Sequence, residues 1–212
     1  MGNGREVKEN IMQNDFHTMI KEIKEYAKRE KIPIMLDDGI DYLTTFIIKH
    51  QITKVLEVGT AIGYSAIMMA ISNKNLKITT IERDENRYLE ALKNIKKFGL
   101  EDRITLIFND ALEVSLTEKF DLIFLDGAKG KNIAFFENFE KNLAPNGYFI
   151  TDNINFHGYV SKDEEEIKSR NLRGLVRKIK NYINYLQESD TYVTEFLEIG
   201  DGIAVTRRKE VG

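Results

Sequence analysis

The sequence predicts an α/β protein built on a mostly parallel sheet, and three observations support that fold class. Short apolar runs alternate with stretches of helical periodicity along most of the chain. The run Val55–Val58 leads through glycines directly into a helical pattern, as a buried strand does when it turns into a helix. Polar and acidic residues also gather where the predicted strands end. The 212 residues suit a single domain, 1–212, because no repeat, linker or low-complexity segment divides them.

The first fifty residues predict a helical cap ahead of the first strand. Apolar residues at helical spacing indicate a helix over Asp15–Lys31, with Asp15 as its N-cap. Pro33 interrupts that pattern, since proline biases its predecessor away from the helix, and a second helix is expected from Asp37 or Asp38 to about His50. We expect this appendage to cover a cofactor or to form the contact of a homodimer.

The rest of the chain alternates strands with helices. The predicted strands after the first are Lys77–Glu82, Ile104–Phe108, Phe120–Asp126 and Tyr148–Thr151. The predicted helices are Tyr64–Ile71, Asp84–Phe98 ended by Gly99, a short one after Asp110, one that ends near Leu143, and a long charged one over about Asp163–Gln187. Pro145-Asn146-Gly147 predicts a turn, and two runs joined by Gly200-Asp201, Thr191–Ile199 and Gly202–Arg208, predict a hairpin. Right-handed crossovers would make the sheet parallel, and the hairpin would add an antiparallel edge.

Composition narrows the classes of function. Charged residues make up 31% and hydrophobic residues 42%, and no apolar run approaches the ~20 residues of a membrane helix. The polar stretch 1–14 lacks a signal-peptide pattern, so we expect a cytoplasmic protein without a membrane partner. The absence of cysteine excludes disulfides and thiolate metal sites. The net charge of -3 gives no global attraction to nucleic acid, so RNA binding would need a local basic patch.

The turn after the first strand has the spacing Glu-x-Gly-x-x-x-Gly, from Glu57 to Gly63. Glycines let the backbone approach a ligand closely, and a helix start suits an anionic group. Glu57 would repel a pyrophosphate but suits a ligand that carries an ammonium and a sulfonium, which favours S-adenosylmethionine over a dinucleotide. Glu82 ends the next strand, where a carboxylate can bind ribose hydroxyls. The alternative is a core-edge salt bridge at Glu57 and a plain strand-end charge at Glu82.

A second polar group follows two later strands. Asp126, Asp152 and Asn153 form an all-oxygen set at the edge where Glu57, Glu82 and Asp110 also lie. Hard oxygen donors without His or Cys favour Mg²⁺, Mn²⁺ or Ca²⁺ over zinc. The set therefore predicts a magnesium or manganese site, and the alternative for Asp152-Asn153 is an Asx turn.

Lys129 lies three residues after Asp126 and is a candidate general base. A nearby divalent cation disfavours the ammonium form of a lysine and lowers the pKa of a bound hydroxyl. The resulting oxyanion could attack a sulfonium methyl group in line. The alternative is a solvated loop lysine.

Four segments together resemble the metal- and S-adenosylmethionine-dependent O-methyltransferases of the catechol and caffeoyl-CoA type. They are Val55–Ala70, Thr79–Glu82, Leu125–Lys129 and Thr151–Asn153. The resemblance implies a Rossmann-like methyltransferase fold with a seven-stranded sheet and helices on both faces. It also implies residue roles: Asp126, Asp152 and Asn153 on the metal, Lys129 as base, Glu82 on ribose, Met35, Glu57, Gly59 and Ser65 around the methionine part with Asp126 nearby, and Asp110 with Ala111 near adenine.

Within that family, the chain is most similar to a short bacterial group that methylates 5-hydroxyuridine at the tRNA wobble position. The shared stretches are Ile32–Met35, Gly59–Ser65 and Gly200–Ala204. Gly127-Ala128 stands where catechol enzymes carry an aromatic residue, which weakens a catechol assignment. The predicted function is therefore magnesium-dependent methyl transfer to the 5-hydroxyl of 5-hydroxyuridine in the tRNA anticodon region, which gives 5-methoxyuridine.

A basic helix face supports RNA binding independently of the family resemblance. On the predicted C-terminal helix, one face carries Arg170, Arg173, Arg177 and Lys180. Such a face could contact phosphates, and Phe156, His157 and Tyr159 could stack on a base. The alternatives are a solvated face balanced by Asp163–Glu166 and a loop that packs on itself.

Three other functions remain open on the sequence. The same chemistry could act on a small catechol-like or hydroxycinnamoyl acceptor, because catechol and 5-hydroxyuridine both present two adjacent oxygens. A nucleotide- or RNA-binding module without catalysis would keep the cofactor pocket only. A dinucleotide dehydrogenase is the most distant alternative.

Overall fold

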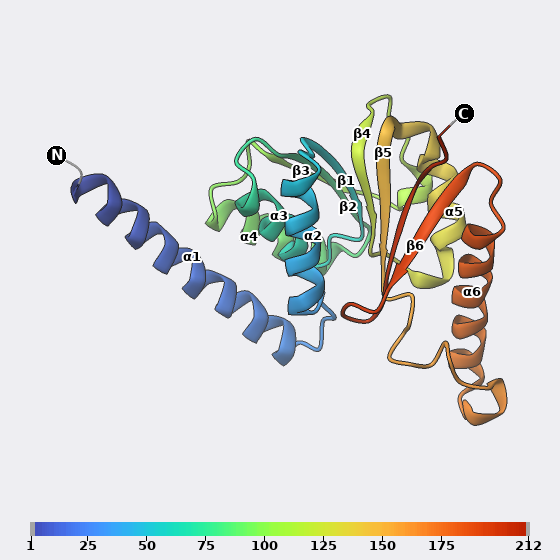
Figure 1. The fold of residues 1–212 in the computed structure, drawn as a ribbon. Coiled ribbons are helices and arrows are strands. Elements are labelled where there is room, and N and C mark those ends of the chain that lie inside the picture. The colour runs from blue at the N-terminus through green and yellow to red at the C-terminus, as the bar shows by residue number, and fades with distance from the viewer. Residues whose placement is uncertain (1–2, 211–212) are drawn as a thin grey trace.

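A seven-stranded sheet with the order β3-β2-β1-β4-β5-β7-β6 forms the centre of the molecule (Figure 1). This computed structural model describes the backbone of residues 3–210 and the side chains of residues 15–210. The strands are β1 Lys54–Val58, β2 Lys77–Glu82, β3 Ile104–Phe108, β4 Phe120–Leu125, β5 Leu143–Asp152, β6 Tyr192–Leu197 and β7 Ile203–Arg208. The first five strands are parallel, and β7 pairs antiparallel with both β5 and β6. The predicted fold class is confirmed.

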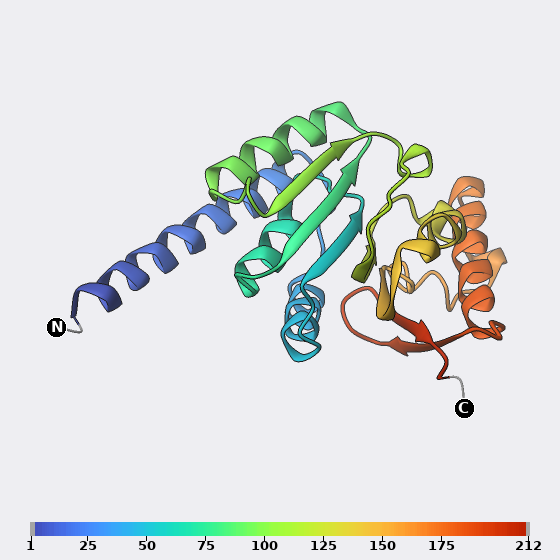
Figure 2. The ribbon, with the colours of Figure 1, turned by 90° about the horizontal axis from the view of Figure 1, so that it is seen from above.

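Helices cover both faces of the sheet, as the view from above shows (Figure 2). The α-helices are α1 Asn3–Arg29, α2 Asp37–Lys49, α3 Tyr64–Ser72, α4 Glu85–Lys97, α5 Asn132–Phe139 and α6 Arg170–Gln187. Short 3₁₀ segments are η1 Ala111–Glu113, η2 Lys129–Lys131, η3 Glu140–Asn142 and η4 Glu164–Glu166. Among the helices with described side chains, none is long and apolar enough for a membrane span.

Two apolar clusters, one on each face of the sheet, follow from the alternation of strand side chains. In β1, Val55 packs in the cluster that also holds buried residues of α2 and α3, whereas Leu56 and Val58 pack in the cluster with α5 and α6. Glu57 therefore points to the face of α2 and α3, away from α5 and α6. This orientation decides where its carboxylate lies in the site.

The N-terminal helices confirm one predicted boundary and correct another. α2 begins at Asp37, as expected, but α1 begins at Asn3, so Asp15 lies inside a helix and is not its N-cap. No proline precedes Asp15 to stop the helix there. Phe16 stacks on Phe98 with ring centroids 5.5 Å apart, which attaches α1 to the end of α4.

Two further predictions are corrected in the second half of the chain. Pro145-Asn146-Gly147 lies within β5, because pairing with β4 starts already at Phe120 and Leu143 and then shifts register. The long helix begins at Arg170, not near Asp163. The helix cannot start earlier because Ile167 is buried in an extended conformation. Ser169 caps α6 by accepting a hydrogen bond from the Leu172 N–H at 3.3 Å.

Candidate active site

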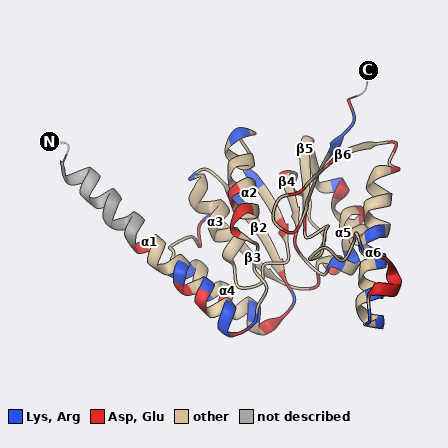
Figure 3. Cartoon of the chain, turned by 60° about the horizontal axis from the view of Figure 1, so that its bottom comes forward, with Lys and Arg blue, Asp and Glu red and all other residues tan. Residues whose placement is uncertain are grey.

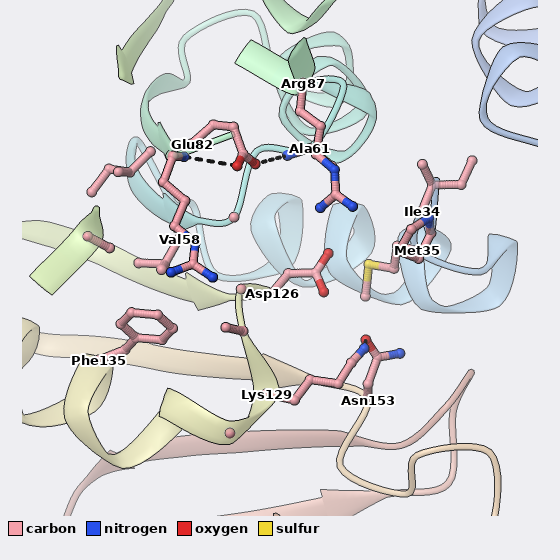
Figure 4. Close-up of a pocket in the computed structure, with 18 of the residues that line it drawn as sticks. Ile34, Met35, Val58, Ala61, Glu82, Arg87, Asp126, Lys129, Phe135 and Asn153 are labelled. Carbon is pink, nitrogen blue, oxygen red and sulfur yellow. Dashed lines mark hydrogen bonds between the residues drawn. The ribbon is translucent and has the colours of Figure 1, made fainter. Parts of the chain in front are cut away.

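A cavity of about 650 Å³ opens at the carboxyl ends of the parallel strands β1, β2, β3 and β4. Such an edge is where open parallel sheets bind ligands. Pro33–Leu36, the segment between α1 and α2, also lines the cavity, so the described part of the predicted N-terminal cap contributes to the wall through this linker. The other predicted site residues in the wall are Gly59, Glu82, Asp110, Ala111, Asp126, Lys129 and Asn153, several of which are drawn in Figure 4.

The turn after β1 needs a glycine because the chain passes very close to β4. Gly59 has φ +99°, and a Cβ atom there would lie 2.6 Å from the carbonyl oxygen of Asp126. The N–H groups of Gly59 and Thr60 both donate to the Ile81 carbonyl, at 3.0 and 3.2 Å. This close approach places the turn and Asp126 on one wall of the cavity.

Two carboxylates are held in fixed orientations at the end of the cavity formed by β2 and β3. Glu82 accepts the Ala61 N–H at 2.8 Å on Oε2 and the Arg83 and Asp84 N–H groups at 2.9 and 2.8 Å on Oε1 (Figure 4). Asp110 accepts the Leu112 N–H at 3.0 Å, and Lys131 and Arg83 lie 3.2 and 3.3 Å away. The Leu112 hydrogen bond, with help from these cations, lowers the pKa of Asp110.

Glu57, Ser65 and Asp152 are the predicted cofactor and metal residues that are not among those lining the cavity. Glu57 is fully buried, and its two oxygens accept hydrogen bonds from the Ser65 and Thr80 hydroxyls, each at 2.5 Å. Burial raises the pKa of Glu57 to about 7 against those hydrogen bonds. The Glu57 carboxylate therefore links β1 to α3 through Ser65 and to β2 through Thr80.

Asp126, Lys129 and Asn153 face one another at the other end of the cavity (Figure 4). Leu125 and Thr151 are paired in register, so Asp126 and Asp152 are neighbours one residue farther along. Burial, together with the negative charge of Asp152, raises the pKa of Asp126 well above its usual range. Burial also raises the pKa of Asp152 to about 6. Lys129 Nζ donates a hydrogen bond to Asn153 Oδ1 and lies 5.6 Å from the centroid of the Phe156 ring.

The chemistry of this end suits a hard cation. The two buried carboxylates repel each other, and Lys129 is the positive neighbour, among the described residues, that lowers the pKa of both. Their oxygens with the Asn153 amide form the donor set that Mg²⁺ prefers. Among the described side chains, no three His, Cys, Asp or Glu residues are grouped for a metal. The third ligand would be the Asn153 amide, whose oxygen is held by Lys129.

The predicted basic face lies on α6 outside the cavity wall and binds the chain's own residues instead (Figure 3). Arg177 pairs with Glu164 at 2.8 Å, Arg173 donates to the Ile167 carbonyl at 2.6 Å, and Lys180 donates to the Lys162 carbonyl at 3.1 Å. Arg170 is exposed. The ion pair between Arg177 and Glu164 agrees with the alternative prediction, in which the acidic run Asp163–Glu166 offsets the charge of the basic face.

Some wall residues carry no motif that sequence reasoning could use. Arg87 and Phe135 reach the cavity from α4 and α5 because of how those helices pack. Asp201 and His157 also line it. The sequence predicts His157 as a candidate for stacking on a base, whereas it marks Asp201 only as part of a hairpin and of the shared stretch Gly200–Ala204.

The comparisons with known proteins agree with this architecture. The O-methyltransferase family profile matches residues 9–209. A caffeoyl-CoA O-methyltransferase from Populus kitakamiensis is 28% identical over 206 residues, which cover 91% of this chain and 87% of that protein. A candidate caffeoyl-CoA O-methyltransferase from Staphylococcus aureus has a TM-score of 0.86 at 33% identity, with 95% of this chain and 99% of that chain covered.

An O-methyltransferase from Bacillus cereus, in complex with SAH, has the same fold with a TM-score of 0.77 at 23% identity, covering 91% of each chain. The fold and the wide span of the family profile therefore lead to one conclusion, which confirms the predicted class of enzyme. The chain belongs to the O-methyltransferase family.

Proposed function

We propose that the chain transfers a methyl group from S-adenosylmethionine to a hydroxyl of a small acceptor of the catechol or hydroxycinnamoyl kind. One observation carries the proposal. A single cavity joins a carboxylate suited to ribose, Glu82, with the candidate base Lys129 and the oxygen donors Asp126 and Asn153. The relatives named as caffeoyl-CoA O-methyltransferases support this class of acceptor.

The end of the cavity near Glu82 suits the methyl donor. Three backbone N–H groups fix the Glu82 carboxylate, and the lone pair that remains on Oε2 can accept a ribose hydroxyl. Asp110 and Ala111 lie beside Glu82, where they could contact the adenine ring, while Met35 and the Gly59 turn border the place for the methionine part. That the Bacillus cereus protein of the same fold was solved in complex with SAH supports a cofactor of this kind.

The other end suits the acceptor hydroxyl. The hydroxyl oxygen would form a bond to the donor's methyl carbon as the carbon–sulfur bond breaks, with S-adenosylhomocysteine as the leaving group. Lys129 Nζ would take the hydroxyl proton as a neutral amine, and for that it must first release its own proton to solvent and leave Asn153 Oδ1. A divalent cation held by Asp126, Asp152 and Asn153 would lower the pKa of the acceptor hydroxyl.

A tRNA acceptor is the second candidate. Gly127 and Ala128 line the cavity without a large side chain, which leaves room for a nucleotide. The basic face gives less support, because Arg173, Arg177 and Lys180 already have partners within the chain. We therefore rank the small acceptor first. The homodimer remains a prediction.

One experiment separates the two acceptors. The protein is incubated with S-adenosylmethionine, Mg²⁺ and either a catechol and hydroxycinnamoyl-CoA series or tRNA that contains 5-hydroxyuridine, and products are identified by mass spectrometry. We expect a methylated small acceptor, with a rate unchanged by the double substitution Arg170→Ala and Arg177→Ala. Methylated tRNA alone, with a rate lost in the double variant, would replace the proposal by the tRNA function.

A further inference from the structure

The segment from Asn153 to Gly158, which follows β5, has an unusual backbone. Three of its residues other than glycine, Asn153, Phe156 and His157, have φ values of 60°, 46° and 56°. Left-handed conformations are uncommon outside glycine, although Asn and His adopt them more readily than a bulky residue such as Phe156 does, and three within five residues need surrounding contacts to hold them. Asn153, Phe156 and His157 all line the cavity at the acceptor end. Something must therefore fix this wall.

The carboxylate of Asp201 makes contacts at both ends of the segment. Its Oδ1 accepts the His157 backbone N–H at 2.5 Å, and its Oδ2 accepts the Asn153 Nδ2–H at 3.3 Å and lies 3.4 Å from His157 Nδ1. The main-chain carbonyl of Asp201 also accepts the Asn155 N–H at 2.9 Å. The Asp201 side chain is only 5% exposed, so water competes little for these hydrogen bonds.

The position of Asp201 is itself fixed by the turn between β6 and β7. A Cβ atom at Gly202 would lie 2.8 Å from the backbone nitrogen of Asn155, so the turn packs directly on the segment. On the other side of Asp201, the Gly200 N–H donates to Asp38 Oδ2 at 3.0 Å, which ties the turn to α2. The carboxylate is thus held between two backbone contacts that a side chain would disrupt.

The hydrogen bond to Asn153 determines which amide atom faces the reaction. Because Nδ2 donates to Asp201, Oδ1 is turned to the opposite side, where Lys129 Nζ donates to it. A carboxylate can only accept in this place, whereas an amide could also donate. We infer that Asp201 is a positioning residue for methyl transfer: it turns the Asn153 oxygen toward Lys129 and holds the Phe156–His157 wall at the acceptor end. The inference rests on the proposed function.

The substitution Asp201→Asn tests this role with little change in size. The new amide can still accept the His157 N–H, but its own NH₂ group would face the Asn153 NH₂ group and favour a reversal of the Asn153 amide. We expect kcat/KM for the acceptor to fall about 10- to 100-fold. The Kd for S-adenosylhomocysteine, measured by calorimetry, should stay unchanged, because Glu82 and Asp110 at the donor end are not touched.

Asp121→Asn is the matched control. Asp121 Oδ2 accepts the Thr53 N–H, the Thr53 hydroxyl and the Lys54 N–H at 2.9, 2.8 and 2.9 Å, at the opposite end of β1 and β4. The control makes the same carboxylate-to-amide change at a residue that also accepts several hydrogen bonds but does not line the cavity, so kcat/KM should stay as in the wild type. An unchanged acceptor kcat/KM in Asp201→Asn, or an equal loss of donor affinity, would overturn the inference.

A second readout keeps the inference separate from the proposed function. If the wild type methylates no small acceptor, the proposed function fails, and the Asn153 side-chain amide signals in a ¹H–¹⁵N NMR spectrum then decide. We expect these signals to shift in Asp201→Asn and to stay in place in Asp121→Asn. Unchanged Asn153 signals in Asp201→Asn would overturn the positioning role whatever the activity.

Discussion

At the scale of single residues, one buried carboxylate shows how a motif residue can act without touching a ligand. The sequence places Glu57 at the centre of the cofactor motif, and the structure places it beneath that motif. Its side chain points to the α2 and α3 face and holds the Ser65 and Thr80 hydroxyls. An acidic residue in such a motif suggests direct contact with a ligand. In this structure the Glu57 carboxylate instead connects β1, β2 and α3 through hydrogen bonds.

Glu57→Gln should change how stability depends on pH. Burial raises the pKa of Glu57 from its ordinary value of 4.5 to about 7, so the folded state keeps a proton that the unfolded state has lost. This group therefore makes wild-type stability fall as pH rises from about 4.5 to 7, by about 3 kcal/mol at most. Denaturant unfolding at pH 5 and pH 8 should show that this fall is absent in Glu57→Gln. Equal falls in both proteins would contradict the prediction.

At the same scale, sequence reasoning located the cavity residues well where type and position agreed. Glu82, Asp110, Asp126, Lys129 and Asn153 all line the cavity, because each follows the carboxyl end of a parallel strand. It misplaced side chains whose direction depends on the pleat or on distant packing. Glu57 is such a case, and the wall residue Arg87, which reaches the cavity from a helix, was not predicted at all.

At the scale of elements, boundaries followed local signals where these existed. The α4 helix begins after Asp84, whose side chain accepts the Arg87 N–H at 3.0 Å, and ends before Gly99 with φ +62°. The α6 boundary depended on the burial of Ile167, which no local periodicity reveals. The start of β5 depended on pairing with β4 across the register shift. These two misses are both tertiary effects that overrode local preference.

Gly59, in the β1–α3 turn, and Gly99, after α4, offer a matched pair of glycine substitutions. Gly59 and Gly99 both have positive φ, but a Cβ atom at Gly59 meets the Asp126 backbone at 2.6 Å, whereas at Gly99 it meets nothing within 4 Å. We expect Gly99→Ala to cost about 1 kcal/mol of unfolding free energy, for the backbone conformation alone. Gly59→Ala should cost about 3 kcal/mol or more, because β1 and β4 must separate. Equal losses in thermal or denaturant unfolding would contradict the close approach.

At the scale of the whole molecule, the sheet brings two chemical groups into one cavity. The donor end is built by β2 and β3, and the acceptor end by β4, β5 and the β6–β7 turn. The alternation of strands and helices in the sequence predicted this arrangement, because parallel strands carry their carboxyl ends to one edge. The role of the terminal hairpin could not be predicted, since the contacts of Asp201 join residues 44 to 48 positions apart.

The most direct test of the account is methyl transfer by Lys129→Met, compared with Lys74→Met, which changes an exposed lysine in the turn before β2. Initial rates are measured with S-adenosylmethionine, Mg²⁺ and the small hydroxylated acceptor that the wild type uses best. We predict that Lys129→Met loses about 10²- to 10⁴-fold in kcat while its affinity for S-adenosylhomocysteine stays unchanged, because in the proposed reaction Lys129 takes the proton of the acceptor hydroxyl and does not bind the donor. Lys74→Met should match the wild type. A Lys129→Met enzyme with wild-type kcat would contradict the account.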